Sequence, residues 1–312
     1  MAKKLTPQVD FSRVLKEISV NRNDPCEIIR ELVSNSYDAK AKNIWYTPLK
    51  EDKGFIFWDD GEGLSMHDQH GVSAYESFFS IGKSTKLNRG ESIGYKCQGS
   101  KLCFASGAVT VITKTAEEQN WRVTSIDDPR SKLNTNMDIT PKSSPMPWTE
   151  LSTLFPAPDQ DTADTLKLFS KNFFEEEFTS GTLIIVQRLD VEEYVKFFLC
   201  EKNKGSYLVN YIRLSTRHGN VKRITPTQGF KAQAIKQVGP ETYFVNFYIR
   251  VNNDWEVIDP GYPYLDLDEP DKEHDQPSSP LQLNSLQYGH FYYRDAKSFK
   301  IGGDKYSVIL AV

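Results

Sequence analysis

The sequence predicts an α+β protein, in which a two-layer α/β sandwich is followed by a smaller β-rich module. Helical and strand-like segments alternate over the first two thirds of the chain, and the segments after about residue 221 are mostly strand-like. The length of 312 residues exceeds the usual range of a single domain, and 38% hydrophobic residues suffice for a sizeable core. We therefore expect two domains, residues 1–222 and 223–312.

Two helices are expected near the N-terminus. Residues 11–20 carry apolar side chains at helical spacing, which predicts a short amphipathic helix. The next helix has a clear start: Asp24 suits the N-cap, Pro25 the first helical position, and Glu27 the position of a capping-box acid. We expect this second helix to run to about Ala41.

Strands are expected next. The runs NIWYTPL and GFIFWDD are rich in β-branched and aromatic residues, and the charged turn between them predicts a hairpin. A region punctuated by glycine follows from residue 61 to 107. After it, AVTVITKT alternates as a strand does, and WRVTSI is expected to pair with it.

The second half begins with a long surface excursion, residues 127 to about 160, rich in Pro, Ser, Thr and Asp. We then expect a helix over 162–178, a buried strand GTLIIVQRL, and one or two helices before residue 221. The tail supplies the strand-like runs YFVNFYIRV, WEVID, GHFYYRD and YSVILAV, interrupted by an acidic loop that we expect to be solvated.

Composition narrows the classes of function. The net charge of −4 and pI near 5.8 give no global attraction to nucleic acid or an anionic membrane. The four cysteines form no C-x-x-C pair, which argues against a zinc site. The N-terminus lacks the apolar run of a signal peptide, and no stretch approaches the length of a transmembrane helix. A cytoplasmic protein is expected.

A polar stripe on the second helix is the first candidate site. Glu31, Asn35 and Asp38 in RELVSNSYDA are spaced four and three residues apart. At about 100° per residue they fall within an arc of roughly 60°, so they can converge on one ligand. A solvated helix edge is the plain alternative.

Two glycine-containing turns are further candidates. WDDGEGLS places an acid after a strand and then two glycines, which suits a backbone that turns sharply beneath a ligand, although an ordinary acidic turn has the same pattern. In IGYKCQGSKLCF, the residues Gly99, Ser100 and Lys101 are expected at a helix N-terminus, which suits a phosphate. IGKST ends like a Walker motif, but Ser77 stands where the first glycine is required, which argues against a P-loop.

The order of these motifs decides the interpretation. Five motifs follow one another along the chain: the helix with Glu, Asn and Asp, then D-x-G-x-G, G-K-S, the glycine loop with lysine, and the GT that opens a strand. In this order of motifs, residues 11–220 resemble the GHKL superfamily, which is named for gyrase, heat-shock chaperones, histidine kinases and MutL. The helix is most similar to that of the ninety-kilodalton heat-shock chaperone, and the arrangement to MORC-like ATPases. The resemblance implies a GHKL-type sandwich that binds ATP with Mg²⁺.

The resemblance also implies roles for single residues. Glu31 would be the general base that activates water, and Asn35 would ligate Mg²⁺. Asp38 and Ala39 would line the nucleotide pocket, and Asp59 would accept a hydrogen bond from the adenine amino group.

Further roles concern the base and the phosphates. Gly61 and Gly63 would allow close approach to the base, Leu64 would pack on it, and Thr182 would share a water with the adenine-binding aspartate. A mobile lid would comprise about residues 65–98. The residues implied in ribose or phosphate contacts are Lys83, Ser84, Gly94, Gly99, Ser100 and Lys101.

Two departures from the family bear on hydrolysis. Cys97 stands near where the family has a glycine in the phosphate loop. No lysine or arginine that would reach the γ-phosphate from a second domain can be identified, and Arg213, Arg217 and Lys222 are expected to be exposed charges. All five histidines lie at position 67 or later, so no phospho-acceptor histidine precedes the motifs.

The leading hypothesis is an ATP-hydrolysing conformational switch, in which Mg-ATP orders the lid and favours a closed state, with homodimerisation as an expectation from the family. The alternative is a nucleotide-responsive module with little hydrolysis that binds a protein partner. A protein kinase of the mitochondrial GHKL type is a third interpretation, for which no substrate signature is present. The client or partner protein is not indicated by any motif.

Overall fold

The computed structural model describes residues 24–69, 71–80, 99–132, 139–145, 178–199, 207–220, 245–251, 254–258, 294–301 and 304–311. The helix expected over residues 11–20 lies outside these ranges, as does the stretch 162–177 that was expected to be helical.

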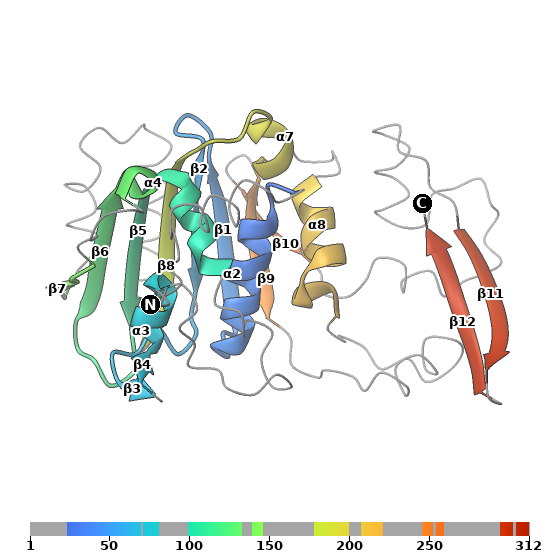
Figure 1. Cartoon of the computed structure of the whole chain (residues 1–312), viewed down its shortest axis with the longest axis horizontal. Helices are drawn as coiled ribbons and strands as arrows, with labels where there is room; N and C mark the ends of the chain where they lie inside the picture. Colours follow the sequence, from blue (N-terminus) through green and yellow to red (C-terminus); the bar gives the residue numbers. More distant parts are fainter. Residues whose placement is uncertain are drawn as a thin grey trace, which may run out of the picture.

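A single eight-stranded sheet forms the centre of the fold. Its strands are β1 (Asn43–Leu49), β2 (Gly54–Asp59), β5 (Ser106–Lys114), β6 (Trp121–Asp127), β7 (Lys142–Ser144), β8 (Gly181–Leu189), β9 (Asn246–Val251) and β10 (Asp254–Ile258). Their order is β10-β9-β1-β2-β8-β5-β6-β7 (Figure 1). All neighbours pair antiparallel except β1 and β9, which are parallel. The predicted β1–β2 hairpin and β5–β6 pair are confirmed.

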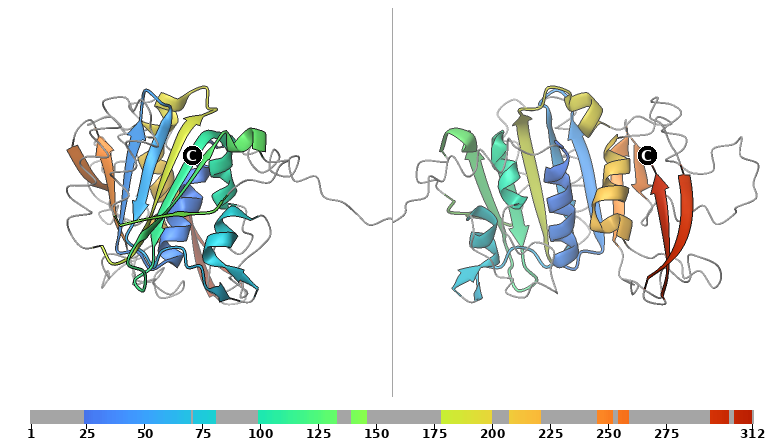
Figure 2. Two further views of the ribbon diagram at one scale, coloured as in Figure 1. Left: turned by 90° about the vertical axis from the view of Figure 1, so that its left-hand side faces the viewer. Right: turned by 45° about the vertical axis from the view of Figure 1, so that its right-hand side comes forward.

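The helices gather on one face of this sheet. They are α2 (Glu27–Asp38), α3 (Ala74–Phe79), α4 (Pro129–Lys132), α7 (Tyr194–Phe198), α8 (Tyr207–Ser215) and the 3₁₀ helices η1 (Gly99–Ala105) and η3 (Arg217–Asn220). Figure 1 shows α2, α3 and α8 in front of the sheet, and the left view of Figure 2 shows the layers from the side. This arrangement confirms the predicted α+β fold. Within the described ranges, no helix is long and apolar enough to cross a membrane.

Both faces of the sheet are buried. On the helix side, Leu32 of α2 belongs to one apolar cluster with Phe57 and Ile184 of the sheet. On the other side a second cluster holds Trp58 and Trp121, whose rings meet edge to face at a centroid distance of 6.2 Å. Because both faces carry apolar side chains, β2 and β8 read as continuous apolar runs in the sequence.

The first two strands of the tail extend the sheet of the sandwich. Both strands lie in the segment that is predicted to form a separate module beyond residue 222, yet β9 pairs with β1 and buries Phe247 and Ile249 in the helix-side cluster. Strands β11 (Arg294–Ile301) and β12 (Asp304–Ala311) form a separate two-stranded sheet, and so do β3 (Asp68–Gln69) and β4 (Val72–Ser73). The division of the chain into two domains at residue 222 stays a prediction.

The helix α2 is shorter than predicted at both ends. Its first helical residue is Glu27, and Asp24 closes the turn before the helix. The Asp24 side-chain carboxylate accepts the Cys26 N–H at 2.8 Å, and the Asp24 backbone carbonyl accepts the Glu27 N–H at 3.2 Å. The helix ends at Asp38, because Lys40 adopts a left-handed backbone with φ of 56°. The polar stripe therefore lies wholly within the helix.

Candidate functional site

The proposed base Glu31 lies against the start of η1. A Cβ placed on Gly99 would stand 2.0 Å from Glu31 Oε2, so a side chain at residue 99 would displace this carboxylate. Glu31 Oε1 is 2.8 Å from Arg30 Nη2, and the same nitrogen is 2.6 Å from the Glu27 carboxylate. Glu31 is thus held between its own helix and the first residue of the glycine loop, although the two segments are far apart in sequence.

The other residues expected near phosphates are only partly described. The Ser100 hydroxyl is buried and donates to the Phe78 carbonyl at 2.9 Å, so it ties η1 to α3. Lys101 lies in η1, and its side chain lies outside the described part of the structure. Lys83, Ser84, Gly94 and Cys97 fall in the stretch 81–98, also outside it.

The remaining members of the α2 stripe differ in what they contact. Among the described residues, the Asn35 side chain has no hydrogen-bond partner; its backbone oxygen accepts the Ala39 N–H at 2.8 Å. Asp38 is different, because its carboxylate is 3.2 Å from the Arg217 guanidinium and its side chain is only 6% exposed. Asp38 therefore contacts η3, at the end of the stripe.

Two of the arginines expected to be exposed are not. Arg213 is buried, and Arg217 pairs with Asp38 while its guanidinium lies 5.5 Å from the centre of the Tyr37 ring. The expectation of exposed charges is wrong for both residues, because the chain packs back after α8 and Arg217, at the start of η3, reaches Asp38 of α2. Lys222 lies outside the described residues.

Asp59 ends β2 in a buried position beside α2. Its carboxylate accepts hydrogen bonds from the Ser36 hydroxyl at 2.8 Å and from the Gly61 N–H at 2.9 Å. Burial raises the pKa of Asp59 to about 6, and these two hydrogen bonds oppose that effect only in part. The neighbouring Asp60 is used differently, because it accepts the N–H groups of Lys42 and Asn43 at 2.7 and 2.8 Å.

The turn after Asp59 packs too closely for side chains at its glycines. A Cβ on Gly61 would stand 2.8 Å from the Cβ of Ala39. Gly63 has a left-handed φ of 74°, and a Cβ there would stand 2.2 Å from the Lys114 carbonyl oxygen. These glycines let the turn pass between the end of α2 and the strand β5.

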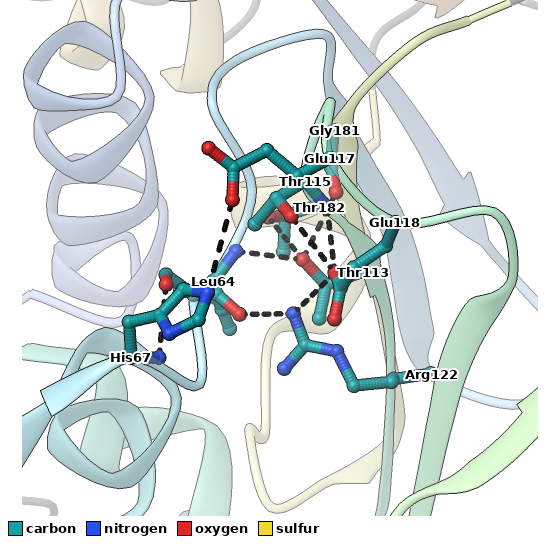
Figure 3. Close-up of polar contacts among 10 residues, drawn as sticks. Leu64, His67, Thr113, Thr115, Glu117, Glu118, Arg122, Gly181 and Thr182 are labelled. Carbon is teal, nitrogen blue, oxygen red and sulfur yellow. Dashed lines mark hydrogen bonds and ion pairs between the residues drawn. The ribbon is translucent and has the colours of Figure 1, made fainter.

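One row of polar side chains crosses four adjacent strands at this level. Asp59 of β2 is in register with Thr182 of β8, Thr182 with Thr113 of β5, and Thr113 with Arg122 of β6. The Thr113 and Thr182 hydroxyls are 3.1 Å apart, and Thr113 Oγ1 accepts the Leu64 N–H at 2.8 Å (Figure 3). The turn, with Leu64 at its end, is thus bonded to the row.

Sequence reasoning missed Ser36, Thr113 and Arg122. Ser36 lies beside the polar stripe, and a buried polar residue on an apolar helix face was the available signal. Thr113 and Arg122 sit in alternating strands, where a threonine or arginine is unremarkable until the register of the sheet is known.

Residues 24–152 match the family model described as histidine kinase-, DNA gyrase B- and HSP90-like ATPase. The match supports the similarity to the GHKL superfamily that the motif order predicts. Similarity to GHKL-type ATPase domains in turn supports ATP binding. Thr182 is outside the matched range, so its place beside Asp59 comes from strand register alone. Among curated proteins, the search found no match to the chain.

Proposed function

We propose that the protein binds Mg-ATP along α2 and hydrolyses it, acting as a GHKL-type conformational switch. One observation carries the proposal: a single helix contacts both the Asp59 turn, through Ser36, and the start of η1, through Glu31. Those two contacts are five residues apart on the helix, about 7.5 Å along its axis. A nucleotide lying along α2 would therefore have its base at Asp59 and its phosphates near Gly99.

At the base end, a buried carboxylate is suited to receive the amino group of adenine. Asp59 keeps acceptor capacity beyond its bonds to Ser36 and Gly61, because an ionised carboxylate has about four lone-pair sites. Leu64 would pack on the base, and the Thr182 hydroxyl would share a water with Asp59. Ala39 and Asp38 would border the same pocket from the end of α2.

At the phosphate end, the residues that suit Mg²⁺ and anions come from α2 and the glycine loop. The Asn35 side chain offers an amide oxygen with no partner among the described residues, which fits a Mg²⁺ ligand. Mg²⁺ bound there would neutralise charge on the phosphates. The backbone N–H groups from Gly99 onward, with Lys101, Lys83, Ser84 and Gly94, would contact the phosphate or ribose oxygens.

The chemical step would need Glu31 to take one proton from a water as that water attacks the γ-phosphorus. The P–O bond to ADP would break, and phosphate and ADP would leave. In the structure Glu31 is bonded to Arg30, so the carboxylate would have to turn toward the water. Closure of the lid, residues 65–98, would exclude bulk water, and homodimerisation would follow from the closed state.

The experiment is phosphate release by the full chain and by Glu31→Ala, with ADP affinity measured on both. We expect phosphate release to fall to background in Glu31→Ala while ADP affinity is retained. Glu27→Ala is the matched control, because Glu27 lies on the same helix and contacts the same arginine. Equal turnover in Glu31→Ala and the parent would refute the role of Glu31.

A second function is favoured by the Arg30–Glu31 ion pair. Glu31 Oε1 is 2.8 Å from Arg30 Nη2, so the carboxylate would have to leave this ion pair before it could contact a water. A protein of this kind would bind nucleotide and recruit a partner protein with little hydrolysis. Tight ATP binding by calorimetry, with turnover at background even at high protein concentration, would select this function over the first.

A further inference from the structure

Leu64 is held by both of its peptide groups. Its N–H donates to Thr113 Oγ1 at 2.8 Å, and its carbonyl oxygen accepts from Arg122 Nη2 (Figure 3). Thr113 and Arg122 are register partners on β5 and β6, so the two contacts come from adjacent points of the sheet. The end of the Asp59 turn is therefore fixed by side chains, on the side away from α2.

The Thr113 hydroxyl is the central group in these hydrogen bonds. It accepts the Leu64 N–H and donates to the Gly181 carbonyl at 3.0 Å. A hydroxyl has one proton, so the 3.1 Å contact with Thr182 must use the proton of Thr182. Replacement of Thr113 by valine would keep the shape of the side chain but deprive the partly buried Leu64 N–H and the buried Gly181 carbonyl of this hydrogen-bond partner.

Arg122 is a buried cation. Its side chain is 9% exposed, and Nη2 is 2.8 Å from Glu118 Oε2 as well as bonded to Leu64. Among the described residues, Nε and Nη1 have no hydrogen-bond partner. A buried guanidinium with only one of its three nitrogens hydrogen-bonded to described residues is a poor choice for packing alone, because an apolar side chain of similar size would serve better. Besides the Glu118 carboxylate and the Tyr75 ring, whose centre lies 5.3 Å away, the guanidinium contacts the Leu64 carbonyl.

Glu118, which pairs with Arg122, is held in place by hydrogen bonds from Thr115. Its Oε2 accepts the Thr115 N–H at 2.9 Å and the Thr115 hydroxyl at 3.0 Å, besides Arg122. Burial of the Glu118 carboxyl favours its neutral form, but the hydrogen bonds from Thr115 and Arg122 outweigh burial and lower its pKa. The carboxylate is thus ionised at neutral pH and holds the guanidinium in place.

We propose that Thr113 and Arg122 are positioning residues that fix Leu64 against the nucleobase and thereby set the preference for adenine over guanine. The inference rests on the proposed function, in which Asp59 binds the base. A carboxylate accepts the amino group of adenine and repels the carbonyl oxygen that guanine has at the same position. That discrimination requires the base to be held in one plane, since a base free to shift would admit a water between the two oxygens.

The test is the ratio of dissociation constants for ADP and GDP, measured by calorimetry on the full chain with Mg²⁺. We expect Thr113→Val to weaken ADP binding about tenfold while GDP binding changes little. The preference for ADP over GDP, given by the ratio of the two dissociation constants, would therefore fall by the same factor. Thr113→Ser keeps the hydroxyl and is expected to restore the ratio. Thr110→Val is the matched control, because this buried threonine of β5 bonds Ser125 at 2.6 Å, on the opposite face of the strand.

Arg122→Met and Arg122→Lys test the positioning role independently, and they are the deciding variants if Thr113→Val does not fold. Both are expected to narrow the ratio, because neither side chain reproduces the planar contact with Leu64 and Glu118. Equal losses for ADP and GDP, or an unchanged ratio in variants that melt normally, would overturn the positioning role alone. If the parent protein bound neither nucleotide, the proposed function would fail, and this inference with it.

Discussion

Asp59 is expected to make nucleoside binding stronger as the pH rises. Burial raises the pKa of Asp59 to about 6, so about a tenth of the protein has this carboxylate ionised at pH 5 and about nine tenths at pH 7. If the adenine amino group binds the ionised form, affinity for adenosine is expected to rise about tenfold between these values. Adenosine is the probe because it has no phosphate that titrates, and calorimetry at pH 5, 6 and 7 gives the profile.

The matched variant is Asp59→Asn, for which adenosine affinity is expected to be weak and independent of pH. Stability gives a second readout. Because folding favours the neutral carboxyl, Asp59 contributes stability that is full below pH 3.8 and is lost as pH rises through about 6, a loss of about 3 kcal/mol. Denaturant unfolding is therefore expected to show a smaller loss between pH 4 and 7 in Asp59→Asn. A flat adenosine profile in the parent, or the same slope in the variant, would refute the reasoning.

Three further changes test the framework around the site. Gly63→Ala is expected to lower the free energy of unfolding by more than about 2 kcal/mol, measured with denaturant. Gly71→Ala is the control: Gly71 also has a positive φ, but the added Cβ would meet open space, so only the backbone strain is expected to lower stability. Equal losses in the two variants would contradict the predicted clash at Gly63. Tyr37→Phe removes the hydroxyl that bonds His218 at 3.0 Å and is expected to cost about 1–2 kcal/mol, measured in the same way; an unchanged free energy of unfolding would show that this bond is not stabilising. Arg217→Met withdraws the cation from the buried carboxylate at the end of α2 and is expected to cost roughly 1–3 kcal/mol, an effect that should persist at high salt, unlike that of an exposed pair.

Local patterns were enough to predict the elements that carry the candidate site. The alternation of AVTVITKT predicted β5, and the acid followed by spaced glycines predicted that Asp59 ends a strand before a close turn. These features depend on residues near one another in the chain, where periodicity and turn chemistry act directly.

Features that depend on register or on distant packing escaped sequence reasoning. Thr113 lies beside Thr182 only because β5 and β8 pair with these threonines aligned, and no local pattern encodes that alignment. Arg217 was expected in solvent for the same reason, since its partner Asp38 lies on a helix far upstream. The role of Glu31 in chemistry stays a prediction that the phosphate-release experiment addresses, and the role of Asn35 as a Mg²⁺ ligand also stays a prediction.

The parallel pairing of β9 with β1 has a consequence for how the protein is made. Asn43 and Asn246 are register partners 203 positions apart, and Asn246 also bonds Asn43 through its side chain. A strand that must wait for a partner so far along the chain closes a very long loop, which slows folding. While the ribosome is still adding the intervening residues, the edge of β1 and the apolar side chains that β9 will cover remain exposed to other chains. The nascent protein therefore passes through an interval in which its candidate ATP site is already synthesised but its sheet is unfinished, and that interval is when aggregation or chaperone binding is expected.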